Sequence, residues 1–154
     1  MIAIVGPGGA GKTTWIKEKF PNKKVVHAVP LTRHWSQYHT PLVEVLMGIE
    51  RVLQSYKAKI IDDCIMDRCF IDGTVYGRYW HSFWITKWFN KIIYKPDVIY
   101  FLSPKDVKAK REFEKDDFRK LKDEYWRALA ENGYVITGNG LYDFGVVFKC
   151  QRRK

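Results

Sequence analysis

A glycine-rich segment near the beginning of the chain has the pattern that holds phosphate groups in many proteins. Residues 6–13 read GPGGAGKT and match GxxxxGK[ST]. Glycines let successive backbone N–H groups turn inward around phosphate oxygens, and the N-terminus of a following helix adds the positive end of its dipole. Lys12 is spaced to reach the β- and γ-phosphates, and the Thr13 hydroxyl to ligate Mg²⁺. The motif predicts a loop that binds ATP and Mg²⁺ through Gly6, Gly8, Gly9, Ala10, Gly11, Lys12, Thr13 and Thr14.

A second group of candidate residues follows an apolar run in the middle of the chain. Residues 60–66 predict a strand, and ligands bind beyond the carboxyl ends of strands in an open α/β sheet. Asp67 would then orient Mg²⁺ or accept a proton, and the planar Arg68 guanidinium would hold a substrate phosphate. A shorter strand ending at Ile61 would instead make Asp63 the metal-contacting carboxylate. Asp67 is favoured because Asp63 would follow only two apolar residues, and a solvated ion pair is the alternative without function.

Basic side chains crowd the region of residues 105–122, and they predict a lid over the nucleotide. Two or three of them would clamp the triphosphate and neutralise charge as it shifts in the transition state. A solvated helix face is the alternative, because acidic residues are interspersed among the basic ones. Arg33, just beyond a predicted second strand, lies where an acceptor would dock.

Four aromatic residues recur every four positions, as one stripe of a helix would: Tyr76, Trp80, Trp84 and Trp88. The simplest interpretation is a core stripe that packs the helix onto the sheet. The alternative is a platform on which a nucleobase or a single strand stacks.

The elements that must position these groups alternate along the chain. A Thr40-Pro41 start signal opens a helix to about Tyr56, and a second long helix runs from Ser103 until Asn132-Gly133 stops it. Strands alternating with helices predict an α/β fold with a parallel sheet, since each short strand is apolar on both faces. The predicted strands cover residues 2–5, 24–28, 60–66, 98–102 and 134–137.

Length, composition and charge narrow the class of protein. The 154 residues show no linker and no repeat, so we expect a single domain over residues 1–154 with a basic tail at 149–154. The 27 basic and 17 acidic residues give a net charge of +10, which predicts an anionic partner such as nucleotide phosphates or nucleic acid. No apolar run is long enough for a membrane span, and the N-terminus does not have the pattern of a secretory signal. Three cysteines without a CxxC pair favour a reducing, cytoplasmic setting.

Three segments together resemble the thymidylate kinase and deoxynucleoside kinase branch of the P-loop kinases. They are GPGGAGKTT, IMDRCFIDGTVYG and PDVIYFLSPKDVKAKR, within roughly residues 1–130. The resemblance implies a three-layer P-loop kinase fold with a five-stranded parallel sheet, flanking helices and a helical lid. It implies that Arg68, Asp72 and Tyr76 lie on the substrate side, and that Lys108, Lys110 or a catalytic Arg111 closes over ATP.

Two departures from the family pattern bear on the acceptor. Thymidylate kinases typically carry an acidic residue in the phosphate loop, where this chain has Gly8, and deoxynucleoside kinases place a glutamate at the end of the first strand, where this chain has Val5. A phosphate acceptor needs little help from a base, because its oxygens are already anionic. We therefore expect Mg-ATP-dependent phosphoryl transfer to a deoxynucleoside monophosphate. The alternative is a kinase that phosphorylates a hydroxyl group of nucleic acid, either at the end of a polynucleotide or on a DNA base. The third possibility is a non-catalytic module that binds a nucleotide as a switch. The oligomeric state stays open, with a dimer among the options.

Overall fold

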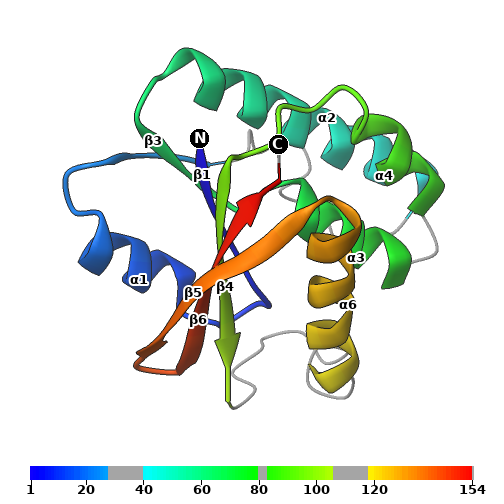
Figure 1. Cartoon of the computed structure of the whole chain (residues 1–154). Coiled ribbons are helices and arrows are strands. Elements are labelled where there is room, and N and C mark those ends of the chain that lie inside the picture. The colour runs from blue at the N-terminus through cyan, green and yellow to red at the C-terminus, as the bar shows by residue number, and fades with distance from the viewer. Residues whose placement is uncertain (28–39, 80–82, 106–117, 154) are drawn as a thin grey trace.

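The computed structural model describes residues 1–27, 40–79, 83–105 and 118–153. The described part is an α/β fold whose sheet has α1 on one face and the other described helices on the opposite side (Figure 1). The strands are β1 (Ile2–Val5), β2 (Lys24–Val26), β3 (Cys64–Asp67), β4 (Val98–Pro104), β5 (Tyr134–Tyr142) and β6 (Gly145–Arg152). The helices are α1 (Lys12–Lys19), α2 (Pro41–Ile60), α3 (Phe70–Tyr79), α4 (Phe83–Phe89) and α6 (Phe118–Glu131).

The alternation of side chains along the strands creates a core on each face of the sheet. On β1, Ala3 and Val5 join one buried cluster, whereas Ile4 joins the other. The first cluster includes Phe70 of α3 and Tyr125 of α6, and the second includes side chains of α1. Figure 1 shows the same arrangement, with α1 on one side and α3 and α6 on the other. Two buried faces explain why β1 is continuously apolar.

The sheet has six strands in the order β2-β3-β1-β4-β6-β5, so the expectation of a five-stranded parallel sheet was wrong. The first four strands in this order pair in parallel, but β6 pairs antiparallel with both β4 and β5. Only Asp143 and Phe144 separate β5 from β6, and a parallel crossover needs a dozen or more residues. The short connection therefore forces a hairpin, in which β6 lies next to β4.

This hairpin also corrects the interpretation of the chain's end as a basic tail. Residues 145–152 form β6, and Cys150 lies in the core at 1% exposure. The stretch from Lys149 to Gln151 has partners on both sides; Lys149, for example, pairs with Tyr100 of β4 and with Gly138 of β5. The strand was missed because residues 149–154 read KCQRRK, in which Cys150 is the only apolar residue, so the alternation typical of a strand is absent there.

Two helix boundaries follow the signals in the sequence, whereas the helix start predicted at Ser103 was wrong, because Ser103 and Pro104 lie in β4. Thr40 caps α2, since its Oγ1 accepts from the Val43 N–H at 3.3 Å, and Pro41 is the first helical residue. At the end of α6, Gly133 adopts φ +79°, the left-handed conformation that ends helices. The predicted lid lies mostly outside the described residues, which resume with α6 at Phe118.

The stripe of aromatic residues divides between the core and the surface. Tyr76 of α3 is 8% exposed and belongs to the core, as predicted. Trp84 and Trp88 of α4 are instead 70% and 58% exposed, so the core interpretation was wrong for them. The reason is that α3 ends at Tyr79 and a separate helix begins at Phe83, which breaks the common face. Trp80 lies outside the described residues.

The three cysteines are unpaired and buried, and burial raises the pKa of each thiol, that of Cys150 to about 11. We expect all three thiols to react very slowly with Ellman's reagent at neutral pH in the folded protein, since few of them are thiolates. In guanidinium chloride all three should react at once. A thiol that reacts in the native protein as fast as a free cysteine would contradict this burial.

No helix among the described residues has the length and apolar character needed to cross a bilayer.

Candidate functional site

The phosphate loop connects β1 to α1, as the motif requires. Its backbone turns sharply at Gly11, which caps α1 with φ +81°, a conformation that is strained for residues with a side chain. A Cβ at Gly6 would lie 2.7 Å from the Leu102 carbonyl oxygen of β4, so only glycine fits against that strand. The loop is thus held close to the carboxyl ends of β1 and β4, at the edge where α/β proteins bind ligands.

The Lys12 ammonium lies inside this loop. Lys12 is the first residue of α1 and is 7% exposed. Its Nζ donates to the carbonyl oxygens of Gly6 at 2.9 Å and Pro7 at 2.8 Å. A buried cation at the N-terminus of a helix favours an anion between the two. The conformation of the loop therefore suits a phosphate group, as the sequence predicted.

Asp67 lies at the carboxyl end of β3, next to the phosphate loop. It pairs in register with Ile4 of β1, and the Arg68 N–H donates to the Ile4 carbonyl at 2.9 Å. Within the described residues, the buried Oδ1 of Asp67 has no hydrogen-bond partner, and Oδ2 lies 3.4 Å from Nδ1 of His27. A buried carboxylate oxygen without a donor costs free energy unless a cation or water meets it. Asp67 therefore fits a cation site beside the loop.

The alternative carboxylate, Asp63, is not at this edge. It precedes β3, at the opposite end of the strand from Asp67, and it is exposed and paired with Lys23. The structure thus separates the two candidates that the sequence left open. A metal role for Asp63 in the phosphate site does not fit this arrangement, because β3 begins only at Cys64 and carries Asp67 to the loop.

The turn after β3 presents Arg68 in a strained backbone conformation. Arg68 has φ +72°, a region that costs an L-residue roughly 1–2 kcal/mol. The side-chain amide of Gln54, 2% exposed on α2, stabilises this turn: its Nε2 donates to the carbonyl oxygens of Val26 at 2.9 Å, Asp67 at 3.0 Å and Arg68 at 3.3 Å. Strained residues that the surrounding structure holds in place are typical of functional sites. One feature of the sequence points to Gln54. It is a polar residue that lies one helical turn before Ala58, and both residues are on the buried face of α2.

Arg51 is a second guanidinium near Arg68 that the sequence did not single out. The side chain of Arg51 on α2 lies against Gly73 of α3, where an added Cβ would be 2.8 Å from Nε. Burial lowers the pKa of Arg51, and the nearby Arg68 charge lowers it further, while Asp72 raises it. Neither guanidinium hydrogen-bonds to a described residue. Two neighbouring arginines whose donors no described residue accepts suit an anion with several oxygens.

Asp72 and Tyr76 were expected on the substrate side, but the structure buries both of them. Asp72 accepts hydrogen bonds from the Gly6 N–H at 3.5 Å, the Cys69 N–H at 3.0 Å and the Tyr125 hydroxyl at 2.7 Å. Its carboxylate thus joins the phosphate loop to the start of α3 and to α6. The physical reason is its place in the first turn of α3, from which an acidic side chain reaches back to the N-terminal N–H groups.

We expect Asp72→Asn to lower the free energy of unfolding by about 2–4 kcal/mol, because the amide cannot accept from all three donors and leaves buried groups unsatisfied. Tyr125→Phe removes one of the three bonds and should cost about 1–2 kcal/mol. Urea denaturation followed by circular dichroism measures both. If Asp72→Asn is as stable as the original protein but has a lower kcat/KM for the phosphate acceptor, Asp72 acts on the substrate side after all.

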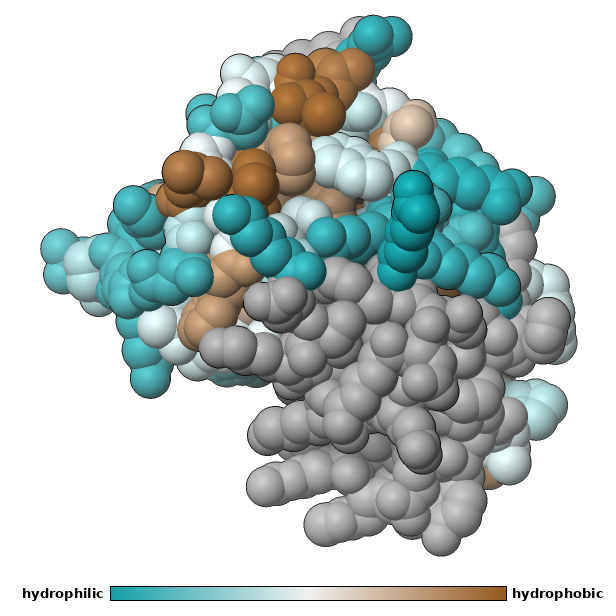
Figure 2. All heavy atoms as spheres, turned by 90° about the horizontal axis from the view of Figure 1, so that it is seen from below, coloured by the Kyte–Doolittle hydropathy of each residue, from teal (hydrophilic) through white to brown (hydrophobic). Residues whose placement is uncertain are grey.

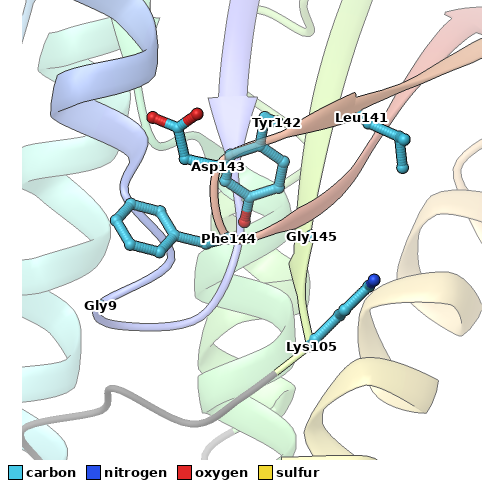
Figure 3. Close-up of a pocket in the computed structure, with 7 residues that line it drawn as sticks. All are labelled: Gly9, Lys105, Leu141, Tyr142, Asp143, Phe144 and Gly145. Atoms are coloured by element: carbon cyan, nitrogen blue, oxygen red, sulfur yellow. The ribbon is translucent and has the colours of Figure 1, made fainter.

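The tip of the β5–β6 hairpin covers the other side of the phosphate loop. The Tyr142 hydroxyl donates to the Ala10 carbonyl at 2.9 Å, and the Phe144 ring lies so close to Gly11 that an added Cβ would be 2.6 Å from it. A cavity of about 260 Å³ lies between the tip and the loop, lined by Gly9, Lys105, Leu141, Tyr142, Asp143, Phe144 and Gly145 (Figure 3). A smaller one, of about 120 Å³, reaches Thr14 and Trp15 of α1. The sequence had no signal for the lining residues of the hairpin, because the hairpin itself was not predicted.

Figure 2 views the molecule from below, toward the edge at which the parallel strands end. The described surface there is mainly hydrophilic, with separate apolar patches.

Thr13 and Thr14 are exposed in the first turn of α1, as a phosphate or metal contact requires. Two predicted site residues, Arg33 and Arg111, lie outside the described residues. No group of three or more candidate metal ligands occurs among the residues that the structure describes.

No model of a known protein family matches the sequence, and no curated protein sequence matches it. Among solved structures, the chain is similar to a crystal structure of the NadR protein in complex with NR, with a TM-score of 0.64 and 18% sequence identity. The similarity covers 84% of this chain but 40% of that one, so the chain spans less than half of the NadR chain. At this identity the likeness concerns the fold alone.

Proposed function

We propose that this protein is a P-loop phosphotransferase that moves a phosphoryl group from Mg-ATP to a deoxynucleoside monophosphate. One observation carries the proposal: the phosphate loop with Lys12 and the strained turn with Arg68 meet at one edge of the sheet, joined by the hydrogen bond from the Arg68 N–H to the Ile4 carbonyl. Phosphoryl transfer needs mainly positioning and positive charge around the moving group. The two elements supply a donor-side and an acceptor-side cation.

A monophosphate acceptor suits the charges at this edge. Arg51 and Arg68 offer two planar guanidinium groups, and a phosphate accepts from such groups through several oxygens. The acceptor oxygen is already anionic, so no strong base is required, in keeping with the absence of a carboxylate at Val5 and Gly8. Arg68 would bind and orient the acceptor phosphate, and Lys12 would neutralise charge on the donor phosphates.

The residues present also fit Mg²⁺. Thr13 is exposed at the start of α1, and Asp67 has a buried oxygen without a donor among the described residues. Two protein oxygens are enough, because Mg²⁺ keeps several waters and binds substrate phosphates directly. When bound, the ion would offset the negative charge of the phosphates.

The hairpin tip is the best candidate for the base of the donor nucleotide, because its aromatic rings flank the loop at Gly9 and Gly11. We expect Phe144→Ala to raise the KM for ATP by about 5-fold or more, since stacking on an aromatic ring contributes roughly 1 kcal/mol or more. The turnover number at saturating ATP should change little. Ile136→Ala, which removes an exposed side chain elsewhere on β5, is the matched control. Equal KM values for ATP in Phe144→Ala and Ile136→Ala would mean that the adenine base binds elsewhere.

Acceptor-dependent release of ADP tests the proposed function. The purified protein is incubated with Mg-ATP and, in turn, each deoxynucleoside monophosphate, each nucleoside and single-stranded oligonucleotides, and the phosphorylated product is identified by chromatography. We expect only monophosphates to stimulate ADP release. Stimulation by oligonucleotides alone would make the acceptor a nucleic acid hydroxyl. Binding of a fluorescent ATP analogue without any transfer would leave a nucleotide-binding switch.

A further inference from the structure

Helix α4 exposes two tryptophans that the core does not need. Trp84 is 70% exposed and Trp88 58%, whereas the residues that follow them, Ile85 and Phe89, lie about 100° further around the helix and are 5% and 9% exposed. Residues four positions apart lie on the same side of a helix, so both indoles project from one face of α4. Ile85 and Phe89 are the side chains that α4 buries. The packing of this helix therefore directs both tryptophans toward the solvent.

The exposed aromatic surface continues onto α2. Phe89 packs against Gly48, where an added Cβ would be 2.2 Å from its ring, and the Tyr94 N–H donates to the Ser55 hydroxyl at 3.2 Å. The segment that follows α4 therefore runs along α2, and Figure 1 shows the two helices side by side. Tyr94 contacts Tyr56 with ring centroids 4.8 Å apart. The exposed side chains of this α2–α4 surface are Tyr56, Ile60, Trp84, Trp88, Ile92 and Tyr94.

Lysines surround these aromatic side chains, and acidic residues are absent. Residues 51–61 and 84–96 contain no Asp or Glu. Four lysines in these stretches are exposed, and none of them has an acidic partner within the described residues: Lys57, Lys59, Lys87 and Lys91. Of the Asp residues that flank these stretches, Asp63 pairs with Lys23 and Asp97 with the N-terminal amine, whereas among the described residues the exposed Asp62 accepts only from the Asp63 N–H. The α2–α4 surface therefore has a net positive charge, since the lysines outnumber Asp62.

We infer that the α2–α4 surface binds single-stranded nucleic acid, with bases stacked on Trp84 and Trp88 and phosphates near the four lysines. Aromatic faces accept any base, and a basic surface that follows the backbone supplies the remaining affinity. A second copy of the chain fits less well, because a two-fold contact through this surface would bring eight lysines together without acidic partners. The inference goes beyond the proposed transfer reaction, since none of these residues lines the cavities beside the phosphate loop.

Fluorescence anisotropy of a fluorescein-labelled oligothymidine tests this inference with the full-length protein. We expect the double variant Trp84→Ala/Trp88→Ala to bind at least about 5-fold more weakly, and up to about 150-fold per stacked base. Trp88→Phe should retain most of the affinity, because it keeps an aromatic face. Between about 50 and 200 mM salt, contacts with four phosphates should reduce the affinity by about 50-fold.

Matched variants separate this surface from general electrostatics and from the phosphate site. Lys17→Ala/Lys19→Ala removes two exposed charges from α1 and should leave binding nearly unchanged, and so should Lys12→Ala, whatever becomes of transfer activity. Circular dichroism verifies that the tryptophan variant is folded. Heparin that binds as tightly as the oligonucleotide would overturn the stacking role. Anionic vesicles bound in place of the oligonucleotide would also overturn the inference, and so would a dimer that dissociates in the tryptophan variant without any oligonucleotide affinity.

Discussion

Replacing Lys12 with alanine should reduce phosphoryl transfer by about 10²- to 10³-fold while the protein stays folded, the effect expected when one preorganised cationic donor is removed. The Lys12 Nζ is bound by the Gly6 and Pro7 carbonyls, so the ammonium is already confined to the loop before a phosphate arrives. Its loss removes charge stabilisation that exposed lysines cannot replace, because they are screened by solvent. Steady-state kinetics with the preferred acceptor measures the loss.

Two controls make the Lys12 result specific. Lys17→Ala removes an exposed charge from the same helix and should not alter the rate. Lys12→Arg preserves the charge, but its planar fork does not match two carbonyls that a compact ammonium now reaches, so we expect it to lose activity as well. Full activity in Lys12→Ala would mean that the loop does not hold the transferred phosphate.

Replacing Arg68 with alanine should lower kcat/KM for the acceptor by about 10- to 150-fold, the equivalent of a charge-assisted hydrogen bond of roughly 1.5–3 kcal/mol. The KM for ATP should stay within about 2-fold, because Arg68 lies on the turn after β3 and outside the phosphate loop. Initial rates over a matrix of the two substrate concentrations separate these effects. An unchanged acceptor kcat/KM would remove Arg68 from the substrate side.

The backbone at Arg68 provides a second measurement that does not depend on activity. Glycine adopts φ +72° without strain, whereas alanine does not. We expect Arg68→Gly to be about 1 kcal/mol more stable toward urea than Arg68→Ala, with the same loss of acceptor use. Equal stability of the two variants would show that the turn relaxes when the guanidinium is absent, and that the side chain itself maintains the conformation.

The phosphate site could be predicted from the sequence to the extent that it depends on local pattern. The loop at residues 6–13, the strand before it and the helix after it are neighbours in the chain, so spacing alone specifies their order. The preference for Asp67 over Asp63 also came from spacing, because only the later aspartate leaves room for an apolar strand. The hairpin at residues 134–152 was missed, since its strands are partly exposed and its basic residues have the composition of a tail.

The sequence by itself therefore determined an α/β chain with a phosphate loop, because glycine, lysine and threonine at this spacing have a local geometry that other residues cannot adopt. Only the tertiary structure decided which other side chains belong to the site. Gln54, Arg51 and Asp72 are far from the loop in sequence, and packing brings them to the turn after β3 and to the loop itself. Their roles depend on distances between elements, and residue type and spacing contain no information about these distances.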